Sequence, residues 1–426
     1  MSTSVKFFTN LMENAPQLAN TWGCLVDLLD ACLVNGFDQR NITTITRDGA
    51  TATATVDGPH KYQVNQVLLI SGANETEFNG EVRVLSVTTN TFTFTIVTSA
   101  PTTATGSIAV KVAPLGFEKV YGELHKGVYR SKNVLSNRPY LRVDNSKAPQ
   151  YNEAWSKKAK VGMAQGMSDI NTVVGAQAPY DPLNPNQNWQ TTGDTDQGNV
   201  VDGWYKWYYA RNGYPNSDVD AITGGNRKWV LVGDDRGFYL FNEMDPSNSA
   251  GAGRVGHCFT DFDSYRQGDP FNTLLTASDW YTTASNSWSW GNGTKTMFTH
   301  TLDYTGKILM RDHTLLGGNQ AVAFTSLNTN NGQTISGRNT GIPFPNPVDY
   351  SLILHPTYLM QSGGKGLRGK MPGLMWVHND NPLQDLEIVE NVVGYAGRKF
   401  IMIRMHGIST ESPNSTMALD ITGPWW

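Results

Sequence analysis

Residues 41–110 differ sharply in pattern from the chain on either side of them. The segment holds 16 threonines in 70 residues, and apolar and polar residues alternate along it with a period of two. This alternation is typical of half-buried strands, and β-branched threonine favours strands over helices. The pattern therefore predicts a small β module inserted at 42–111. Residues 1–41 and 112–426 are expected to form one discontinuous main domain.

Inside the insert, residues 42–57 predict a hairpin with its turn at Asp48-Gly49, a favoured dipeptide for two-residue connections. Further strands are expected at 67–72, 81–87 and 91–97. In the last of these, three apolar side chains point one way, and they are Phe92, Phe94 and Ile96. Five or six short strands at this spacing predict a small barrel or sandwich.

The N-terminal segment predicts a helix over residues 16–34. Leu25, Leu28, Leu29 and Cys32 recur at helical spacing and form one apolar stripe. Asn20 or Thr21 could cap its start, and Asn35-Gly36 supplies a left-handed exit. We therefore expect a helix that packs on the core, with its two cysteines buried and unbridged.

The remainder of the chain predicts a β-rich main domain, so the fold class is mainly β (α+β) with one N-terminal helix. Eleven of the twelve tryptophans lie at or beyond Trp155. Long Asn-, Gly- and Pro-rich stretches, such as 179–203 and 326–349, separate the strand candidates. These candidates are the residues 119–123, 228–233, 237–242, 295–300, 307–311, 351–356 and 399–405.

Composition narrows the classes of partner. The net charge is −4 and charged residues make up 16% of the chain, which argues against a nucleic-acid partner held by charge. No signal peptide and no apolar run of about 18 residues is present, so neither secretion nor membrane insertion is predicted. Three cysteines do not make a disulfide framework, and they fit folding in a reducing cytoplasm.

Three clusters of acidic residues are candidates for a chemical site. His257, Asp261 and Asp263 could bind a metal, but a strand entering a turn fits better, with both aspartates on one face and no third ligand. Asp234 and Asp235 in GDDRG suit a hairpin turn with solvated acids. Asp312-His313 lacks the serine or cysteine context of a nucleophile. We therefore predict no catalytic residue, no metal and no cofactor, and hence no enzyme.

The run WYKWYY is the densest aromatic cluster in the sequence. Its rings could anchor a subunit interface or stack against a sugar, or they could point into a β core. The interface reading predicts a subunit contact at Trp204, Trp207, Tyr208 and Tyr209.

Several short motifs resemble structural proteins of tailed bacteriophages. They are APQL…LVDLLDACLVNGF, LGFEKV…KGVYRS…RPYLRVD, HCFTDFDSYRQGD and RGKMPGL…FIMIRM…ALDITGPWW, with PHKYQVNQVLLISGA and FNGEVRV in the insert. The insert resembles the small β modules of phage tail and baseplate proteins. The resemblance implies a virion component of the tail or baseplate, present in several symmetric copies and assembled in the host cytoplasm.

Low charge and long polar loops suit a part held among neighbouring subunits. We therefore expect a homotrimer or hexamer that contacts other tail or baseplate proteins. Two alternatives stay open at this point. One is a host-surface or polysaccharide-binding or -degrading tail protein, although no β-helix repeat is found. The other is a head–neck component.

Overall fold

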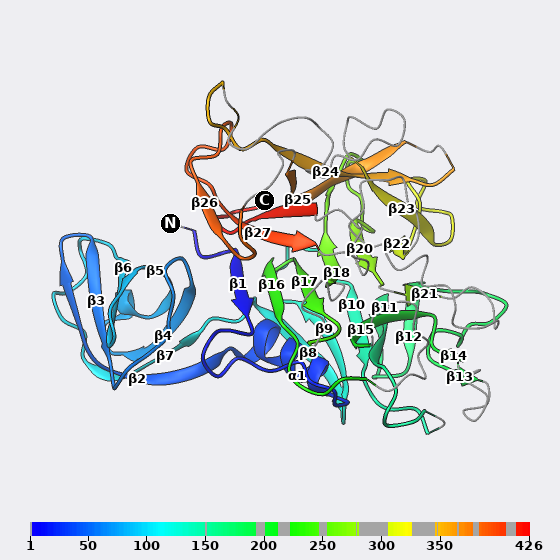
Figure 1. The fold of residues 1–426 in the computed structure, drawn as a ribbon, viewed down its shortest axis with the longest axis horizontal. Coiled ribbons are helices and arrows are strands. Elements are labelled where there is room, and N and C mark those ends of the chain that lie inside the picture. Colours follow the sequence, from blue (N-terminus) through cyan, green and yellow to red (C-terminus); the bar gives the residue numbers. More distant parts are fainter. Residues whose placement is uncertain are drawn as a thin grey trace.

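The chain folds as a β protein with a closed barrel beside a larger body of two sheets (Figure 1). This confirms the predicted fold class, including the small β module and the single short α-helix. The computed structural model describes residues 2–149, 151–192, 201–211, 222–246, 254–277, 279–280, 306–325, 346, 348–363, 366–377, 383–405 and 415–426. The strand expected at 295–300 lies outside these residues.

The inserted module is a barrel of six antiparallel strands closed in the order β2-β3-β6-β5-β4-β7. Its inner face is lined by the alternating apolar residues, so Phe92 and Phe94 are buried as predicted. Gly49 and Ala50 connect the first hairpin, one position later than expected. The strands are β2 (Phe37–Asp48), β3 (Thr51–Val56), β4 (Val67–Ala73), β5 (Gly80–Val87), β6 (Thr91–Thr95) and β7 (Gly106–Val112), with a 3₁₀ turn η2 (Thr76–Phe78).

The larger sheet of the body has 13 strands within the described residues, and their printed pairings are all antiparallel. Its order is β1 (Lys6–Thr9), β16 (Trp229–Asp234), β17 (Gly237–Glu243), β18 (Arg254–Asp261), β20 (Thr273–Thr276), β22 (Lys307–Leu309), β23 (Gln320–Thr325), β24 (Leu354–Gln361), β25 (Leu367–Val377), β28 (Ser415–Asp420), β27 (Lys399–Met405) and β26 (Ile388–Glu390), with β19 (Asp263–Ser264) beside β25.

The smaller sheet has seven strands among the residues described, and a separate two-stranded ribbon, β13 (Thr191–Thr192) and β14 (Val201–Asp202), lies beyond it. The two sheets pack face to face, and the ring of Trp207 lies 6.1 Å from that of Phe238. The order is β21 (Asp279–Trp280), β15 (Tyr205–Ala210), β11 (Lys157–Met167), β10 (Tyr140–Asp144), β9 (Lys126–Ser131) and β8 (Phe117–Glu123), with β12 (Val173–Ala178) beside β11.

The N-terminal helix is shorter than predicted. It comprises α1 (Cys24–Leu29), which continues as a π-helical turn η1 (Asp30–Asn35). The residues before it are not helical: Leu18 forms an isolated β-bridge with Arg227 of the body, and residues 20–23 form bends and turns. The predicted side-chain caps are wrong: Asn145 Oδ1 instead accepts hydrogen bonds from the backbone N–H groups of Gly23 and Leu25, at 2.9 and 3.2 Å.

The apolar stripe of this helix is fully buried, as predicted, and it joins one core that runs through the helix, the barrel and both sheets. The rings of Phe8 in β1 and Phe37 in β2 lie 6.1 Å apart at the barrel–body junction. Cys24, Cys32 and Cys258 are free and buried, which confirms that Cys24 and Cys32 are unbridged. No helix among the described residues is long and apolar enough to cross a bilayer.

Candidate functional site

The aromatic run of β15 lies in the interior of the subunit. Trp207, Tyr208 and Tyr209 have no exposed surface, and only Trp204 is partly exposed. A side chain without exposed surface cannot touch a second subunit, so the predicted contact is corrected for these three residues. The rings of Trp207 and Tyr209 point into the shared core, while Tyr208 lies on the opposite face of β15.

That opposite face is also buried, and the charges on it are paired with one another. On β11, Lys160 Nζ lies 3.1 Å from Asp202 Oδ1, and Lys158 Nζ lies 3.6 Å from Asp202 Oδ2. Burial raises the pKa of Asp202, but the two lysines outweigh burial and hold that pKa below its ordinary value. Lys158 also lies over the ring of Tyr151, at 3.8 Å from the centroid.

The three residues considered as metal ligands, His257, Asp261 and Asp263, have separate surroundings. His257 is fully buried in β18, stacks on Trp207 and has Nε2 3.2 Å from the carbonyl of Tyr208. Asp261 is buried and accepts a hydrogen bond from Thr273, whereas Asp263 is exposed. The expectation that the two aspartates share one face is therefore wrong. The strand is interrupted between them, where the N–H of Phe262 binds the carbonyl of Asn272.

Asp312 and His313 also have separate partners. The carboxylate of Asp312 accepts the backbone N–H of Thr314 at 3.0 Å, which closes a local turn. The Nδ1 of His313 lies 3.1 Å from the side-chain nitrogen of Gln361. Within the part of the chain that the structure describes, no three His, Cys, Asp or Glu side chains are grouped closely enough to hold a metal ion.

The GDDRG segment is the hairpin turn between β16 and β17, as predicted, but Asp234 is not solvated. Its side chain is buried, with 1% of the residue exposed, and Oδ1 accepts the backbone N–H groups of Arg236 and Gly237 at 2.8 and 3.1 Å. Its Oδ2 accepts the indole N–H of Trp426 at 2.8 Å. Burial raises the pKa of Asp234 to about 7.

The Arg236 side chain contacts both Trp426 and a second acid, Asp261. Its guanidinium lies 3.8 Å from the ring centroid of Trp426, and its Nε lies 3.3 Å from Asp261 Oδ2. Burial raises the pKa of the Asp261 carboxyl as well. The arrangement is a closed network in which each charged group has an internal partner, so it fastens residues 421–426 to the hairpin.

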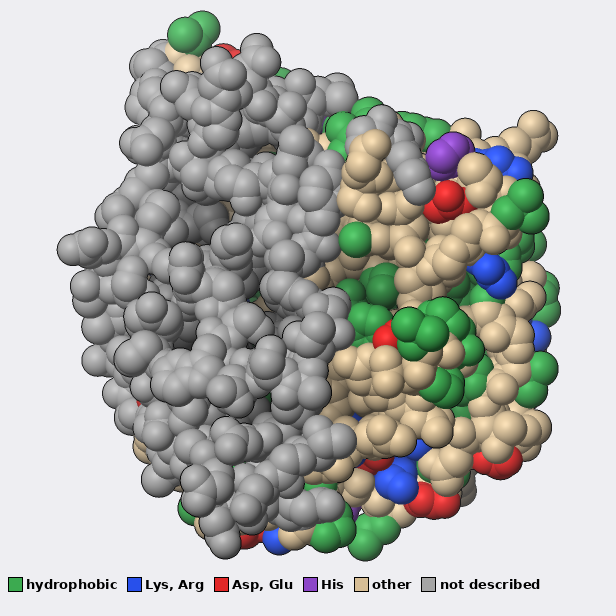
Figure 2. Space-filling view, turned by 90° about the vertical axis from the view of Figure 1, so that its right-hand side faces the viewer, with side chains coloured by type: hydrophobic (Ala, Val, Ile, Leu, Met, Phe, Trp, Pro, Cys, Tyr) green, Lys and Arg blue, Asp and Glu red, His purple; other side chains and the backbone are tan. Residues whose placement is uncertain are grey.

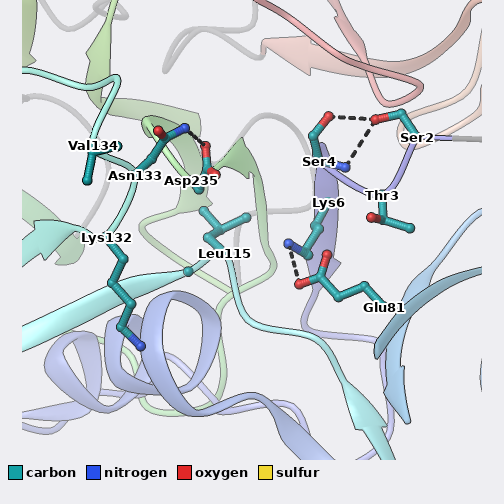
Figure 3. Close-up of a pocket in the computed structure, with 11 residues that line it drawn as sticks. Ser2, Thr3, Ser4, Lys6, Glu81, Leu115, Lys132, Asn133, Val134 and Asp235 are labelled. Carbon is teal, nitrogen blue, oxygen red and sulfur yellow. Dashed lines mark hydrogen bonds and ion pairs between the residues drawn. The ribbon is translucent and has the colours of Figure 1, made fainter. Parts of the chain in front are cut away.

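A cleft of about 830 Å³ opens beside this hairpin, between the barrel and the body. Figure 3 shows Lys6 and Glu81 joined at one end and Asn133 joined to Asp235 at the other, with Leu115 between them. Its lining residues are Ser2, Thr3, Ser4, Lys6, Glu81, Leu115, Gly116, Lys132, Asn133, Val134 and Asp235.

The cleft exists because two paired strands separate. Strands β1 and β16 pair from Thr9–Val230 up to Lys6–Gly233. Beyond that pair, the side chain of Leu115 occupies the space beside Gly233, where a Cβ would lie 2.7 Å from it. The residues that precede β1 lie against the barrel, where the carbonyls of Ser2 and Val5 accept hydrogen bonds from Arg83 of β5.

One wall of the cleft is the β9–β10 loop, residues 132–139, whose position is fixed by many hydrogen bonds. Asn133 Nδ2 binds Asp235 Oδ1 at 3.0 Å, and the hydroxyl of Ser131 binds the carbonyl of Asp235 at 2.5 Å. Yet the tip of this loop displays two apolar side chains, Val134 and Leu135, which are 80% and 77% exposed.

Arg83 connects the barrel to both ends of the described body. It donates to the carbonyls of Ser2, Asn65 and Val5 at 2.8, 2.8 and 2.9 Å, and to that of Thr422 at 3.5 Å. Burial lowers the pKa of this guanidinium. Sequence reasoning placed Arg83 on a strand of the insert but gave no signal for this role, because its partners are backbone carbonyls distant in sequence.

Comparisons with protein-family models and with curated proteins gave no match. The site offers a fixed wall with an apolar tip, a cleft with hydroxyls and opposite charges, and a rigid junction. This combination suits non-covalent contact with another macromolecule.

Proposed function

We propose that this chain is a non-enzymatic structural component of a tailed-phage virion, with the tail or baseplate as its place. The observation that carries the proposal is the junction at Arg83, which ties the barrel to residues from both ends of the body. A part that transmits load between neighbours needs its modules held rigidly, and this junction fixes them. The resemblance of the flanking motifs to phage structural proteins points the same way.

The described surface also suits a part that is packed among neighbours. In the described part of the face shown in Figure 2, charged side chains of both signs are scattered, and apolar side chains form clusters between them. Interfaces between protein subunits are depleted in charge at their centres, so such a surface can be covered without a large desolvation cost.

The polysaccharide alternative loses its main support. Sugar stacking needs exposed rings, and Trp207, Tyr208 and Tyr209 are buried. The acids of the GDD and DFD segments are the candidates for a degrading site. Asp234 and Asp261 are bound to Trp426, Arg236 and Thr273, whereas Asp235 accepts a hydrogen bond from Asn133 and Asp263 lies 3.8 Å from Lys370. No observation on the described residues favours a head–neck position over the tail.

Antibody labelling tests this proposal directly. Particles assembled from a genome that encodes this chain would be labelled with antibody to the purified protein and imaged by negative stain. We expect label at the tail or baseplate, and none after the antibody is pre-absorbed with the protein. Label on the head–neck junction, or particles that lack the chain by mass spectrometry, would contradict the proposed place.

A further inference from the structure

The strongest unexplained feature is the pair of exposed apolar side chains on a rigid loop. Exposed loop tips are commonly mobile and polar, because an ordered apolar side chain in water is costly. Here the loop is fixed at both ends: Arg138 Nε binds the carbonyl of Ser131, and Asn137 binds the carbonyl of Asp269. A side chain that is already ordered loses little entropy on binding, which is how interface anchors behave.

The cleft next to this tip has room for such side chains. Its volume falls within the range of about 300–1,000 Å³ that is typical of binding pockets. Leu115, which is 1% exposed, lies at the base of the cleft, and Val134 is the other apolar residue that lines it. Gly116 has positive φ, and a Cβ there would lie 3.4 Å from the Cβ of Asp235. Among the described residues, the peptide N–H of Thr3 and the carbonyl of Ser4 have no hydrogen-bond partner, so they offer two further positions to a bound loop.

The charges at the cleft are complementary to those beside the tip. Lys6 and Glu81 satisfy each other at 3.0 Å. Lys132, next to the tip, is exposed and forms no ion pair with a described residue. Asp235, in the cleft, is bound by the neutral Asn133 but by no cation among the described residues. One unpaired cation and one unpaired anion therefore lie on the same small surface.

We propose that this surface joins two copies of the chain about a two-fold axis. In this contact the Val134–Leu135 tip of each copy lies at the cleft of the other, and Lys132 of each copy pairs with Asp235 of the second. A two-fold contact uses the same patch on both copies, so a tip and a cleft that adjoin are both satisfied at once. The inference rests on the proposed assembly role, which supplies the reason for copies to associate.

The test is sedimentation equilibrium of the purified full-length protein. We expect a dimer, or a higher oligomer built from it, that Val134→Ser with Leu135→Ser weakens about a hundredfold, as for two interface anchors. The matched control is Leu183→Ser with Leu316→Ser, since those side chains are equally exposed elsewhere. That control should leave the dissociation constant unchanged, and both double variants should keep the wild-type unfolding midpoint.

A charge exchange tests the pairing itself. Lys132→Asp and Asp235→Lys should each weaken association at low salt, and their combination should restore it to within about threefold. A wild-type monomer at about 100 µM, equal effects of the tip and control variants, or no restoration by the exchange would overturn the interface. The particle-labelling test does not depend on this contact. A monomeric chain found in the tail would overturn only the two-fold contact. A dimeric chain absent from particles would overturn only the proposed role.

Discussion

The indole N–H of Trp426 donates a hydrogen bond of 2.8 Å to the carboxylate of Asp234, which joins residue 426 to a hairpin 192 positions earlier in the chain. The centroid of the same indole ring lies 3.8 Å from the Arg236 guanidinium, so one side chain contacts two of the three charged residues of the turn. This contact fastens the segment after β28 to β16 and β17.

Replacing Trp426 with phenylalanine should therefore destabilise the fold. The variant keeps a ring for Arg236 but leaves Asp234 Oδ2 without its donor, which typically costs about 1–3 kcal/mol. Chemical denaturation would measure the loss. Trp425 has its own hydrogen bond to the carbonyl of Asp420, and it should remain in place in the variant. A free energy of unfolding equal to that of the wild type would show that water replaces the indole.

Asp234→Asn should change how stability depends on pH. The folded-state pKa of Asp234 is about 7, above the ordinary value near 3.8. Between about pH 4 and pH 7, the carboxyl is therefore protonated in the folded state and ionised in the unfolded state. Through this group, the free energy of unfolding falls as pH rises from about 4 to 7, by on the order of 4 kcal/mol. The asparagine variant should gain stability relative to the wild type over that range. The free energy of unfolding would be measured by urea denaturation at several pH values. The same dependence on pH in both proteins would contradict this prediction.

His257→Gln tests an effect of opposite sign. Complete burial lowers the pKa of His257 to about 3, so the unfolded state takes up a proton below pH 6.5 while the folded state does not. The free energy of unfolding should fall as pH drops from about 7 to 4.5, by about 2–3 kcal/mol through this group. Glutamine cannot protonate, so the variant should lose that acid sensitivity even if lost stacking on Trp207 lowers its stability at all pH values. The measurement is the free energy of unfolding of both proteins at pH 7 and at pH 4.5. An equal loss in the two proteins between these pH values would contradict the prediction.

Arg83→Lys should loosen the barrel–body junction. Lysine keeps the charge but lacks the planar fork that reaches the carbonyls of Ser2, Asn65 and Val5 together. We expect a loss of about 2–4 kcal/mol and faster amide hydrogen exchange in β1. The matched control is Arg47→Lys, whose arginine binds the carbonyls of Ala100 and Gly49 within the barrel. If both variants changed β1 exchange equally, the junction role of Arg83 would be wrong.

Local pattern predicted a large part of the fold. The alternation of Phe92 and Phe94 with threonine placed them inside a small β module, and the leucine stripe of residues 25–29 is buried as expected. Hairpin chemistry located the turn at residues 234–237. These features depend on near neighbours in the chain, because the period of apolar residues and the backbone preference of turn residues set them directly.

The contacts at the candidate site required the tertiary structure. Neither the burial of Asp234 by Trp426, nor the capping of α1 by Asn145, nor the role of Arg83 depends on local spacing, since each joins residues far apart in sequence. The aromatic run of β15 shows the same limit. Its rings looked equally suited to an interface or a core, and Trp207 became a core residue only because β17 packs against it. Local pattern was enough to predict most of the barrel strands, several strands of the body such as β16, β17 and β27, and their apolar faces, but not strands such as β11 and β25. Only the three-dimensional packing decided which polar groups lose water and which partners compensate them.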